Sequence, residues 1–479
     1  IQSKAYIIHP NYARIATPYT PVSGNPTPKL PESSSPGSPP ATRNQTGPTM
    51  SCSLDLSKVA PTPCLLPAWP LAYSARKVLT HRYTFAGASL LEGEVSPLRA
   101  AIASWLCDYY ASYGGMVDET RIAVTAGEVE GALAAILARF TDPVYTRTVW
   151  VVLPAEVGWL EGIVGDAGLD GKLRTLPEGS NGEGIDMEIF EDRLRDEEDW
   201  FGLMEDPGPG FKEGDRYPKI YKSILFLQPT FKNPTGSTIP LSARTRLLEL
   251  ARQYDFLIVA EEDFDFLRWG EGSIGPPIPR LCDVDRVMMG DTGGFGNAIS
   301  CGSFGRMIAP GCGVGWIEGP RRFVEEFGKT YSNHDRNSAT ASKLMGAIVR
   351  NLLSAGAFES HLSDVLIPVY QRRHSAVVCA VETSLAPLGV NIITDTSRNS
   401  GGWFLWIQLP KGCRASFLER LEDDYNVILS GGNEFGVGLE NFVRLCFAWE
   451  SEQALLESVK RIAMCLRDIE PDILLGESI

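Results

Sequence analysis

Histidine is scarce in this chain, with five residues in 479, and the ten cysteines form no CxxC pair. Clusters of these two residue types are the usual ligands of structural zinc, so the sequence predicts no metal site. Cysteines without a pairing pattern are typical of a reducing compartment, and we expect a cytoplasmic protein. No apolar run approaches the roughly 20 residues that a membrane-spanning helix requires, so no membrane association is expected.

Positive charge is also in short supply. The chain has 44 Lys and Arg residues against 59 Asp and Glu residues, a net charge of −15, and no block of basic residues. This balance argues against binding to nucleic acid or to an anionic membrane surface. Hydrophobic residues make up 44% and charged residues 22% of the chain, which is ordinary for a globular enzyme of two domains.

The first fifty residues have few apolar side chains and many Pro, Ser, Thr and Asn residues, as in the stretch from Pro31 to Pro40. Such a segment cannot bury enough apolar surface to order itself, so residues 1–50 are expected to be disordered. A natural translation start near Met50 is one explanation for this segment, and a transit peptide is the alternative.

Short apolar runs bounded by turn-forming residues follow, at residues 149–153, 224–227, 256–260 and 287–289. Runs of this kind favour buried parallel strands. Ser242 is predicted to cap a helix between two of them, and that helix presents apolar residues on one face. Residues 95–330 are therefore expected to form a doubly wound α/β domain. Further strands expected at 392–393, 403–407 and 442–447 indicate a smaller α+β domain within residues 331–479.

One motif resembles a known family. Residues 302–306 read Gly-Ser-Phe-Gly-Arg, and Pro310-Gly-Cys-Gly313-Val-Gly-Trp316 follows. This is similar to Gly-Ser-Phe-Ser-Lys-x-x-x-Pro-Gly-x-Arg-x-Gly-Trp, the cofactor-lysine motif of fold-type I pyridoxal phosphate (PLP) aminotransferases of class I and II. The resemblance places Arg306 where the family has the lysine that forms a Schiff base. A guanidinium stays protonated and forms no imine with an aldehyde.

Further matches extend the resemblance over about residues 57–470. The residues of these motifs most resemble those of aminotransferase-like proteins of fungi. Pro229-Thr-Phe-Lys-Asn-Pro-Thr-Gly236 matches the family's Pro-x-x-x-Asn-Pro-Thr-Gly, and Asn441-Phe-Val-Arg444 resembles a strand of the small domain. The resemblance implies a fold-type I aminotransferase-like architecture: a large doubly wound domain (95–330) with a mostly parallel sheet, a smaller C-terminal α+β domain (331–479), and an N-terminal arm with a cleft loop (51–94). It also implies a homodimer.

The resemblance assigns roles to individual positions. Asn233 would serve the phenolate oxygen of PLP, Glu261 or Glu262 its ring nitrogen, and Arg444 a substrate carboxylate. At other positions the residue differs from the family pattern, so the PLP site that the resemblance implies is degenerate. The residues of this degenerate site are Asn233, Glu261, Ser303, Arg306, Gly313 and Val129. Losing three charged hydrogen bonds to a phosphate costs several kcal/mol at about 1.5–3 kcal/mol each. On these grounds no cofactor is expected.

The sequence thus favours a cofactor-independent isomerase, cyclase or pericyclase-like enzyme of secondary metabolism in a vacated PLP pocket. Its substrate would be a small carboxylate- or carbonyl-bearing metabolite. The expected catalytic residues are Arg306, Glu261 and Glu262. The expected substrate-binding residues are Arg444, Asn233, Phe264, Glu156, Trp159 and His334. Two alternatives stay open: an aminotransferase-like enzyme that holds PLP non-covalently, and a catalytically dead binding dimer in which Arg306 pairs with Glu261 or Glu262 and plugs the pocket.

Overall fold

The computed structural model divides the chain into two compact units, Ile1–Pro48 and Thr49–Ile479. The residues whose structure is described all belong to the second unit: 53–80, 97–110, 113, 115–179, 184–203, 208–270, 276–290, 293–330, 342–396, 400–413 and 415–476. None of the helices in these ranges is both long enough and apolar enough to cross a membrane.

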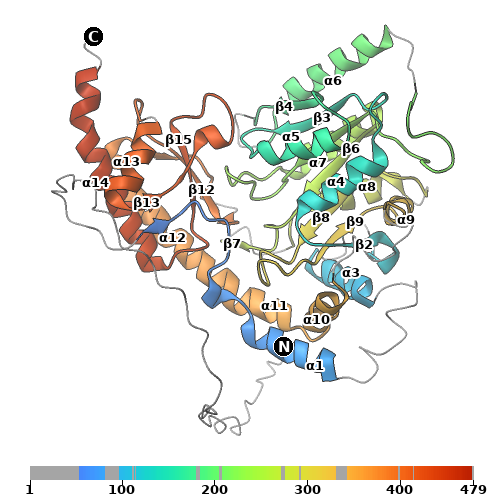
Figure 1. Ribbon diagram of the computed structural model, residues 1–479, viewed down its shortest axis with the longest axis horizontal. Helices are drawn as coiled ribbons and strands as arrows, with labels where there is room; N and C mark the ends of the chain where they lie inside the picture. The colour runs from blue at the N-terminus through green and yellow to red at the C-terminus, as the bar shows by residue number, and fades with distance from the viewer. Residues whose placement is uncertain are drawn as a thin grey trace, which may run out of the picture. The chain divides into compact units, whose positions relative to one another are not determined.

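A seven-stranded sheet forms the centre of the larger lobe (Figure 1). Its strand order is β2 (Ile122–Thr125), β9 (Gly315–Glu318), β8 (Ala298–Ser303), β6 (Phe256–Glu261), β5 (Ser223–Leu227), β3 (Thr148–Val152) and β4 (Leu173–Leu176). β9 runs antiparallel to both of its neighbours, and the other pairings are parallel. The expected mostly parallel, doubly wound arrangement is confirmed.

Both faces of this sheet are covered because successive strand residues point to opposite sides. Val149 and Val151 of β3 join one apolar cluster, whereas Trp150 and Val152 join another. The first cluster includes residues of α4 (Val129–Phe140), α5 (Gly158–Asp166) and α9 (Arg321–Gly328). The second includes residues of α6 (Met187–Gly202), α7 (Leu241–Tyr254) and α8 (Leu281–Met289).

A four-stranded antiparallel sheet lies in the smaller lobe, on the left of Figure 1. Its order is β10 (Asn391–Ile392), β12 (Phe404–Gln408), β15 (Phe442–Cys446) and β14 (Ser430–Gly431). The helices of this lobe are α12 (Ile367–Ser384), α13 (Ala415–Tyr425) and α14 (Glu452–Gly476), and α14 packs on the other two. β1 (Leu54–Asp55) pairs with β13 (Val427–Ile428) beside them.

Several elements connect the two lobes. β7 (Arg268–Trp269) of the larger lobe pairs with β11 (Ser400–Gly401), which precedes β12. A continuous helical stretch of α11 (Ala357–His361), a π-helical turn (Leu362–Leu366) and α12 runs toward the small sheet. α10 (Lys343–Ser354) contacts α1 (Ala68–Thr80), α3 (Pro97–Tyr109) and α11, and these helices gather at the lower edge of Figure 1. The 3₁₀ turns are Pro63–Leu65, Glu119–Arg121, Ala386–Leu388 and Gly432–Glu434.

Two local expectations were wrong. Residues 287–289 are not a strand but the end of α8, because the apolar side chains that this segment buries, such as Leu281 and Val284, recur with helical spacing while Val287 is exposed. A run of three apolar residues is too short to distinguish the spacing of buried residues in a helix from their spacing in a strand. Ser242 does not cap α7, since the helix already begins at Leu241 after Pro240. The expected buried face of α7 is present in Leu247, Leu250 and Ala251.

Candidate functional site

A cavity of about 90 Å³ opens at the carboxyl ends of the parallel strands β3, β5 and β6. In doubly wound folds this edge of the sheet is where ligands bind. Five chain segments come together around it. The lining residues are Val129, Glu130, Val151, Val152, Ala155, Glu156, Trp159, Leu160, Phe226, Leu227, Gln228, Lys232, Asn233, Glu261 and Arg306.

Arg306 lies in the turn after β8 and faces this cavity, with 22% of its side chain exposed. Its Nε donates a hydrogen bond of 3.1 Å to Asp263 Oδ2, and its guanidinium lies 5.4 Å from the ring centre of Phe264. Burial lowers the pKa of Arg306, but Asp263 and Glu261 outweigh burial and raise that pKa above its usual range. The expected ion-pair partner was a glutamate, and the structure instead gives Asp263. The side chain borders the cavity rather than filling it.

Glu261 ends β6 and is one of three glutamates that line the cavity, with Glu130 and Glu156. Gln228 Nε2 donates to its Oε2 at 2.7 Å. Burial, reinforced by the charge of Asp263, raises the pKa of Glu261 to about 8 although Arg306 opposes the shift. Glu261 is therefore largely protonated near neutral pH and can donate as well as accept a hydrogen bond.

Glu262 is not among the lining residues. Because side chains alternate along a strand, it points to the other side of the sheet, where Ser300 Oγ donates to it and Arg280 lies 3.8 Å away. Burial raises its pKa well above the usual range, against the effect of Arg280. The structure thus separates the two glutamates that the sequence analysis grouped together as catalytic candidates.

Arg444 of β15 reaches the cavity wall from the smaller lobe and is itself 3% exposed. Its Nη1 donates to Glu156 Oε1 at 2.5 Å and to Asn233 Oδ1 at 2.9 Å, and both of those residues line the cavity. Ser430 Oγ also accepts from Arg444 at 2.9 Å. The rings of Phe404 and Phe435 lie within about 5 Å of the guanidinium, so the side chain is fixed from several directions. The place expected for a substrate carboxylate holds the carboxylate of Glu156.

Several other predicted positions are also at or near the cavity. Val129 and Trp159 line it, and Trp159 packs edge-on against Phe226. Phe264 is buried beneath Arg306 and packs against Trp403 and Phe404. His334 lies outside the described residues.

Gly313 of the degenerate cofactor site lies against Gly127, which comes just before α4. Gly127 has φ +116° and Gly313 φ +60°, and a Cβ on Gly127 would lie 3.0 Å from Gly313 Cα. A side chain at either position would be strained, which is a structural reason for glycine at residue 313. Ser303 is buried, and its Oγ accepts from the backbone of Gly305 at 3.0 Å.

Lys232 is one of the lining residues that the sequence analysis did not predict, as is Gln228. It lies in the turn between β5 and α7, directly before Asn233, and is 5% exposed. The available signal was a lysine inside the Pro-x-x-x-Asn-Pro-Thr-Gly match. The family motif leaves that position open, and nothing in the linear sequence shows that this side chain is buried rather than exposed to solvent.

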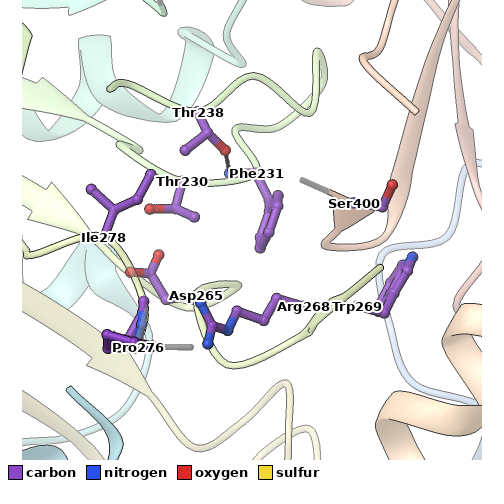
Figure 2. A pocket seen from close by; sticks show the side chains of 10 residues that line it. Thr230, Phe231, Thr238, Asp265, Arg268, Trp269, Pro276, Ile278 and Ser400 are labelled. Atoms are coloured by element: carbon purple, nitrogen blue, oxygen red, sulfur yellow. Dashed lines mark hydrogen bonds between the residues drawn. The ribbon is translucent and has the colours of Figure 1, made fainter. Parts of the chain in front are cut away.

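A second, smaller cavity of about 60 Å³ lies beside β7 (Figure 2). Asp265, Arg268 and Trp269 line it together with Phe231 and Ser400. Tyr110 Oη donates to Asp265 Oδ2 at 3.0 Å, and burial raises the pKa of Asp265 to about 6. The turn that contributes Phe231 to this cavity contributes Lys232 to the first, so both depend on the same short segment.

Within the described residues, one group of side chains has the composition of a metal site: Cys282, Asp283 and Glu318. Arg280 lies 2.9 Å from Asp283 and 2.6 Å from Glu318, and Arg286 also pairs with both carboxylates. Two guanidinium groups thus already neutralise these carboxylates, and the group forms a buried ionic network.

Comparison with known proteins identifies the family. The aminotransferase class I and II family matches residues 102–462, so the chain belongs to that family. The uncharacterized protein YER152C of Saccharomyces cerevisiae is 30% identical over 315 residues, covering 63% of this chain and 68% of the relative. The 2-aminoadipate transaminase of Thermus thermophilus is 27% identical over 413 residues, covering 85% of this chain and 89% of the relative.

A solved structure shares the architecture. LysN, the α-aminoadipate aminotransferase of Thermus thermophilus, aligns with a TM-score of 0.66 at 25% identity, over 88% of this chain and 93% of LysN. That structure is a complex with N-(5′-phosphopyridoxyl)-L-leucine. The expectation that the chain takes no cofactor is contradicted by these findings. It relied on the arginine at the lysine position and on lost phosphate contacts at single positions, and the comparisons point to PLP.

Proposed function

We propose that the protein is a PLP-using enzyme that acts on a small substrate with a carboxylate, and that Arg306 does not bond covalently to the cofactor. The observation that carries this proposal is the contact of Arg444 with Glu156 and Asn233 at the cavity wall. A buried arginine aimed at the edge of a polar cavity is suited to hold a carboxylate. Family membership supplies the cofactor class.

The lining residues fit a group with a pyridine ring, a phenolate and an anionic arm. Asn233 offers an amide donor, Glu261 offers a carboxyl that is largely protonated near neutral pH, and Arg306 offers a permanent positive charge. Lys232 adds a second cationic side chain to the lining, and its buried Nζ lies 3.8 Å from Glu178 Oε2.

When bound, PLP draws electrons from the substrate carbon next to the reacting nitrogen. Asn233 would orient the ring, Glu261 would hold the proton opposite the ring nitrogen, and Arg306 would neutralise negative charge. The motif places Arg306 at the family's lysine position, and its guanidinium forms no imine.

Substrate binding would require Glu156 to leave Arg444. Glu156 has 43% of its side chain exposed, so it can turn toward solvent, whereas Arg444 is held by Ser430 and two aromatic rings. An incoming carboxylate would replace Glu156 at the guanidinium. Small amino acids or keto acids meet this requirement.

N-(5′-phosphopyridoxyl)-L-leucine is a direct probe, because it carries the ring, the phosphate and a carboxylate but no aldehyde. We expect it to bind the purified protein in isothermal titration calorimetry. Arg444→Ala should weaken binding by about 2–5 kcal/mol, since the ligand carboxylate loses a buried charged partner. Arg193→Ala, on the exposed face of α6, is the matched control and should leave the affinity unchanged.

Absence of binding at millimolar concentration would overturn the cofactor assignment. Equal affinity of the parent and of Arg444→Ala would overturn the substrate assignment. Circular dichroism of each variant, together with Arg444→Lys, would separate a lost contact from a lost fold.

We also propose that the protein is a homodimer, as the family resemblance implies. Trp69 and Tyr73 support this, because they lie one turn apart on α1, stack at 5.7 Å and are 73% and 54% exposed. Adjacent exposed aromatic rings are typical of a contact surface. A second copy of this chain is the proposed partner.

A further inference from the structure

We infer that Gln228 is a positioning residue of this site: it holds one oxygen of Glu261 as an acceptor and so directs the acid proton to the other oxygen. This role rests on the proposed function, in which Glu261 lies opposite the ring nitrogen of the cofactor. Gln228 directly follows β5 and lines the cavity. The motif that matches the family begins one residue later, at Pro229, and assigns no role to Gln228.

Two hydrogen bonds fix the side-chain amide of Gln228. The backbone N–H of Asn233 donates to Oε1 at 2.7 Å, and Nε2 donates to Glu261 Oε2 at 2.7 Å. A backbone N–H can only donate, so the amide oxygen has to face Asn233 and the amide nitrogen has to face Glu261. The opposite orientation would place the NH₂ group against the N–H of Asn233. The amide therefore has a single favourable orientation.

This orientation decides which oxygen of Glu261 carries the proton. Nε2 of Gln228 offers only hydrogens, so Oε2 has to accept, and a protonated carboxyl accepts best through its carbonyl oxygen. The proton is then on Oε1. That oxygen has no hydrogen-bond partner in the described part of the chain, and unlike Glu262 Oε1 it is not sealed from solvent. Because Glu261 lines the cavity, Oε1 can offer its proton to a ligand there.

Gln228 also connects the acid to the opposite wall of the cavity. Asn233, whose N–H it accepts, receives a hydrogen bond from Arg444 at 2.9 Å and donates through Nδ2 to Glu156 at 3.3 Å. One planar amide with two short hydrogen bonds thus sets the spacing between Glu261 and Asn233. Groups that act on the same ligand need such a fixed spacing, because a loosely held site binds less well.

Several charged groups face Glu261 and affect how tightly it holds its proton. Burial raises its pKa and the charges of Asp263 and Glu130 add to this effect, whereas Arg306 and the hydrogen bond from Gln228 lower the pKa. A donor to a carboxyl stabilises the charged form. Loss of the Gln228 donor should therefore raise the pKa of Glu261 further.

Infrared spectroscopy of the full-length, ligand-free protein tests the orientation. At pH 6 the band of the protonated Glu261 carboxyl is identified by its loss in Glu261→Gln. In Gln228→Met this band should move to higher wavenumber, because the carbonyl oxygen has lost its donor. Gln253→Met, at an exposed glutamine of α7, should leave the band in place. An unmoved band in folded Gln228→Met protein would overturn the inference.

Titration calorimetry with phosphopyridoxyl-leucine relates this orientation to ligand binding. The affinity of the parent protein should fall as rising pH removes the proton shared by Glu261 and the ring nitrogen. Gln228→Glu keeps an acceptor for the N–H of Asn233 but replaces the donor to Glu261 by a charge. The fall in affinity should therefore occur at a pH higher by about one unit or more. Gln253→Glu, the same change at an exposed position, should keep the parental profile.

The two measurements separate failure of this inference from failure of the proposed function. If the parent protein binds the probe and Gln228→Glu keeps the parental pH profile, Gln228 only supports the turn and the inference is wrong, while the cofactor assignment stands. If the parent protein does not bind the probe, the proposed function is wrong, and the infrared band decides whether Gln228 orients Glu261. Circular dichroism shows that each variant is folded. Should Gln228→Met not fold, Gln228→Glu carries the test, because it keeps the acceptor for Asn233.

Discussion

At the residue scale, the Arg444–Glu156 pair joins the two lobes at the cavity wall. Arg444 is almost fully buried, while Glu156 keeps 43% of its side chain in contact with solvent. An ion pair with one solvated partner is weak, because the solvated carboxylate gains little by staying. Glu156 is therefore suited to yield to a substrate carboxylate.

We predict that Glu156→Gln strengthens the binding of phosphopyridoxyl-leucine. Removing a half-exposed competing carboxylate should gain roughly 0.5–1 kcal/mol, which is about two- to fivefold in affinity. Titration calorimetry measures the effect, with Glu161→Gln on the exposed face of α5 as the matched control. Weaker binding in Glu156→Gln would instead mean that Glu156 contacts the ligand favourably.

Glu261 provides a pH-dependent prediction. Its pKa in the folded protein is about 8, against an ordinary value of 4.5, because burial and Asp263 disfavour its charge despite Arg306. The folded state holds this proton more tightly than the unfolded chain, so its contribution to stability is fully present below about pH 4.5 and is lost as the pH rises toward 8.

The difference in melting temperature between Glu261→Gln and the parent should therefore favour the variant more at pH 8.5 than at pH 5. Differential scanning calorimetry at both pH values measures this difference. Glu419→Gln, an exposed glutamate on α13, should show the same difference from the parent at both pH values. A gain for Glu261→Gln that is independent of pH would count against the burial of a protonated carboxyl.

At the element scale, the turn between β5 and α7 depends on its contact with β11. Phe231 has φ +49°, and its ring lies against Gly401. A Cβ on Gly401 would lie 2.2 Å from the Phe231 ring and 2.5 Å from the carbonyl oxygen of Leu267. The backbone oxygen cannot move away without breaking the β7–β11 pairing.

We expect Gly401→Ala to destabilise the protein by roughly 1–3 kcal/mol, the usual cost of overpacking. Urea unfolding measures this change. Gly162→Ala is the control, because a Cβ there meets nothing within 4 Å and alanine favours a helix over glycine by about 1 kcal/mol. If both variants were equally stable, Phe231 would not be packed against β11 as described. Gly401→Ala should also weaken phosphopyridoxyl-leucine binding, since the displaced turn carries Asn233.

At the scale of the whole molecule, the proposed homodimer can be tested at the exposed aromatic rings of α1, which are its expected contact surface. We predict that the parent protein sediments as a dimer at micromolar concentration and that Trp69→Glu shifts it toward monomer. Trp200→Glu is the control, because Trp200 is 62% exposed on α6, a different element. A parent protein that sediments as a monomer would rule out the dimer, and dimers unaffected by Trp69→Glu would place the contact elsewhere.

The sequence by itself determined the family and the architecture. Apolar runs such as residues 224–227 and 256–260 are buried on both sides, and a buried parallel strand requires such a run wherever it lies in the fold. The motifs around Asn233, Arg306 and Arg444 also predicted which positions meet at the cavity, because the family resemblance carries the order of the strands with it. A three-residue apolar run at 287–289 was too short to show its period, and the strand expected there is a helix.

The tertiary structure decided which side chains face one another. Glu261 and Glu262 are neighbours in the chain, and only the alternation along β6 assigns one to the cavity and the other to Arg280. The pairing of Glu156 with Arg444 spans 288 positions. The burial of Lys232 beside Asn233 depends on how the turn after β5 packs against β4 and β11. Charge and pKa arise from such contacts between distant segments, so a linear reading could name the residues of this site but not their partners.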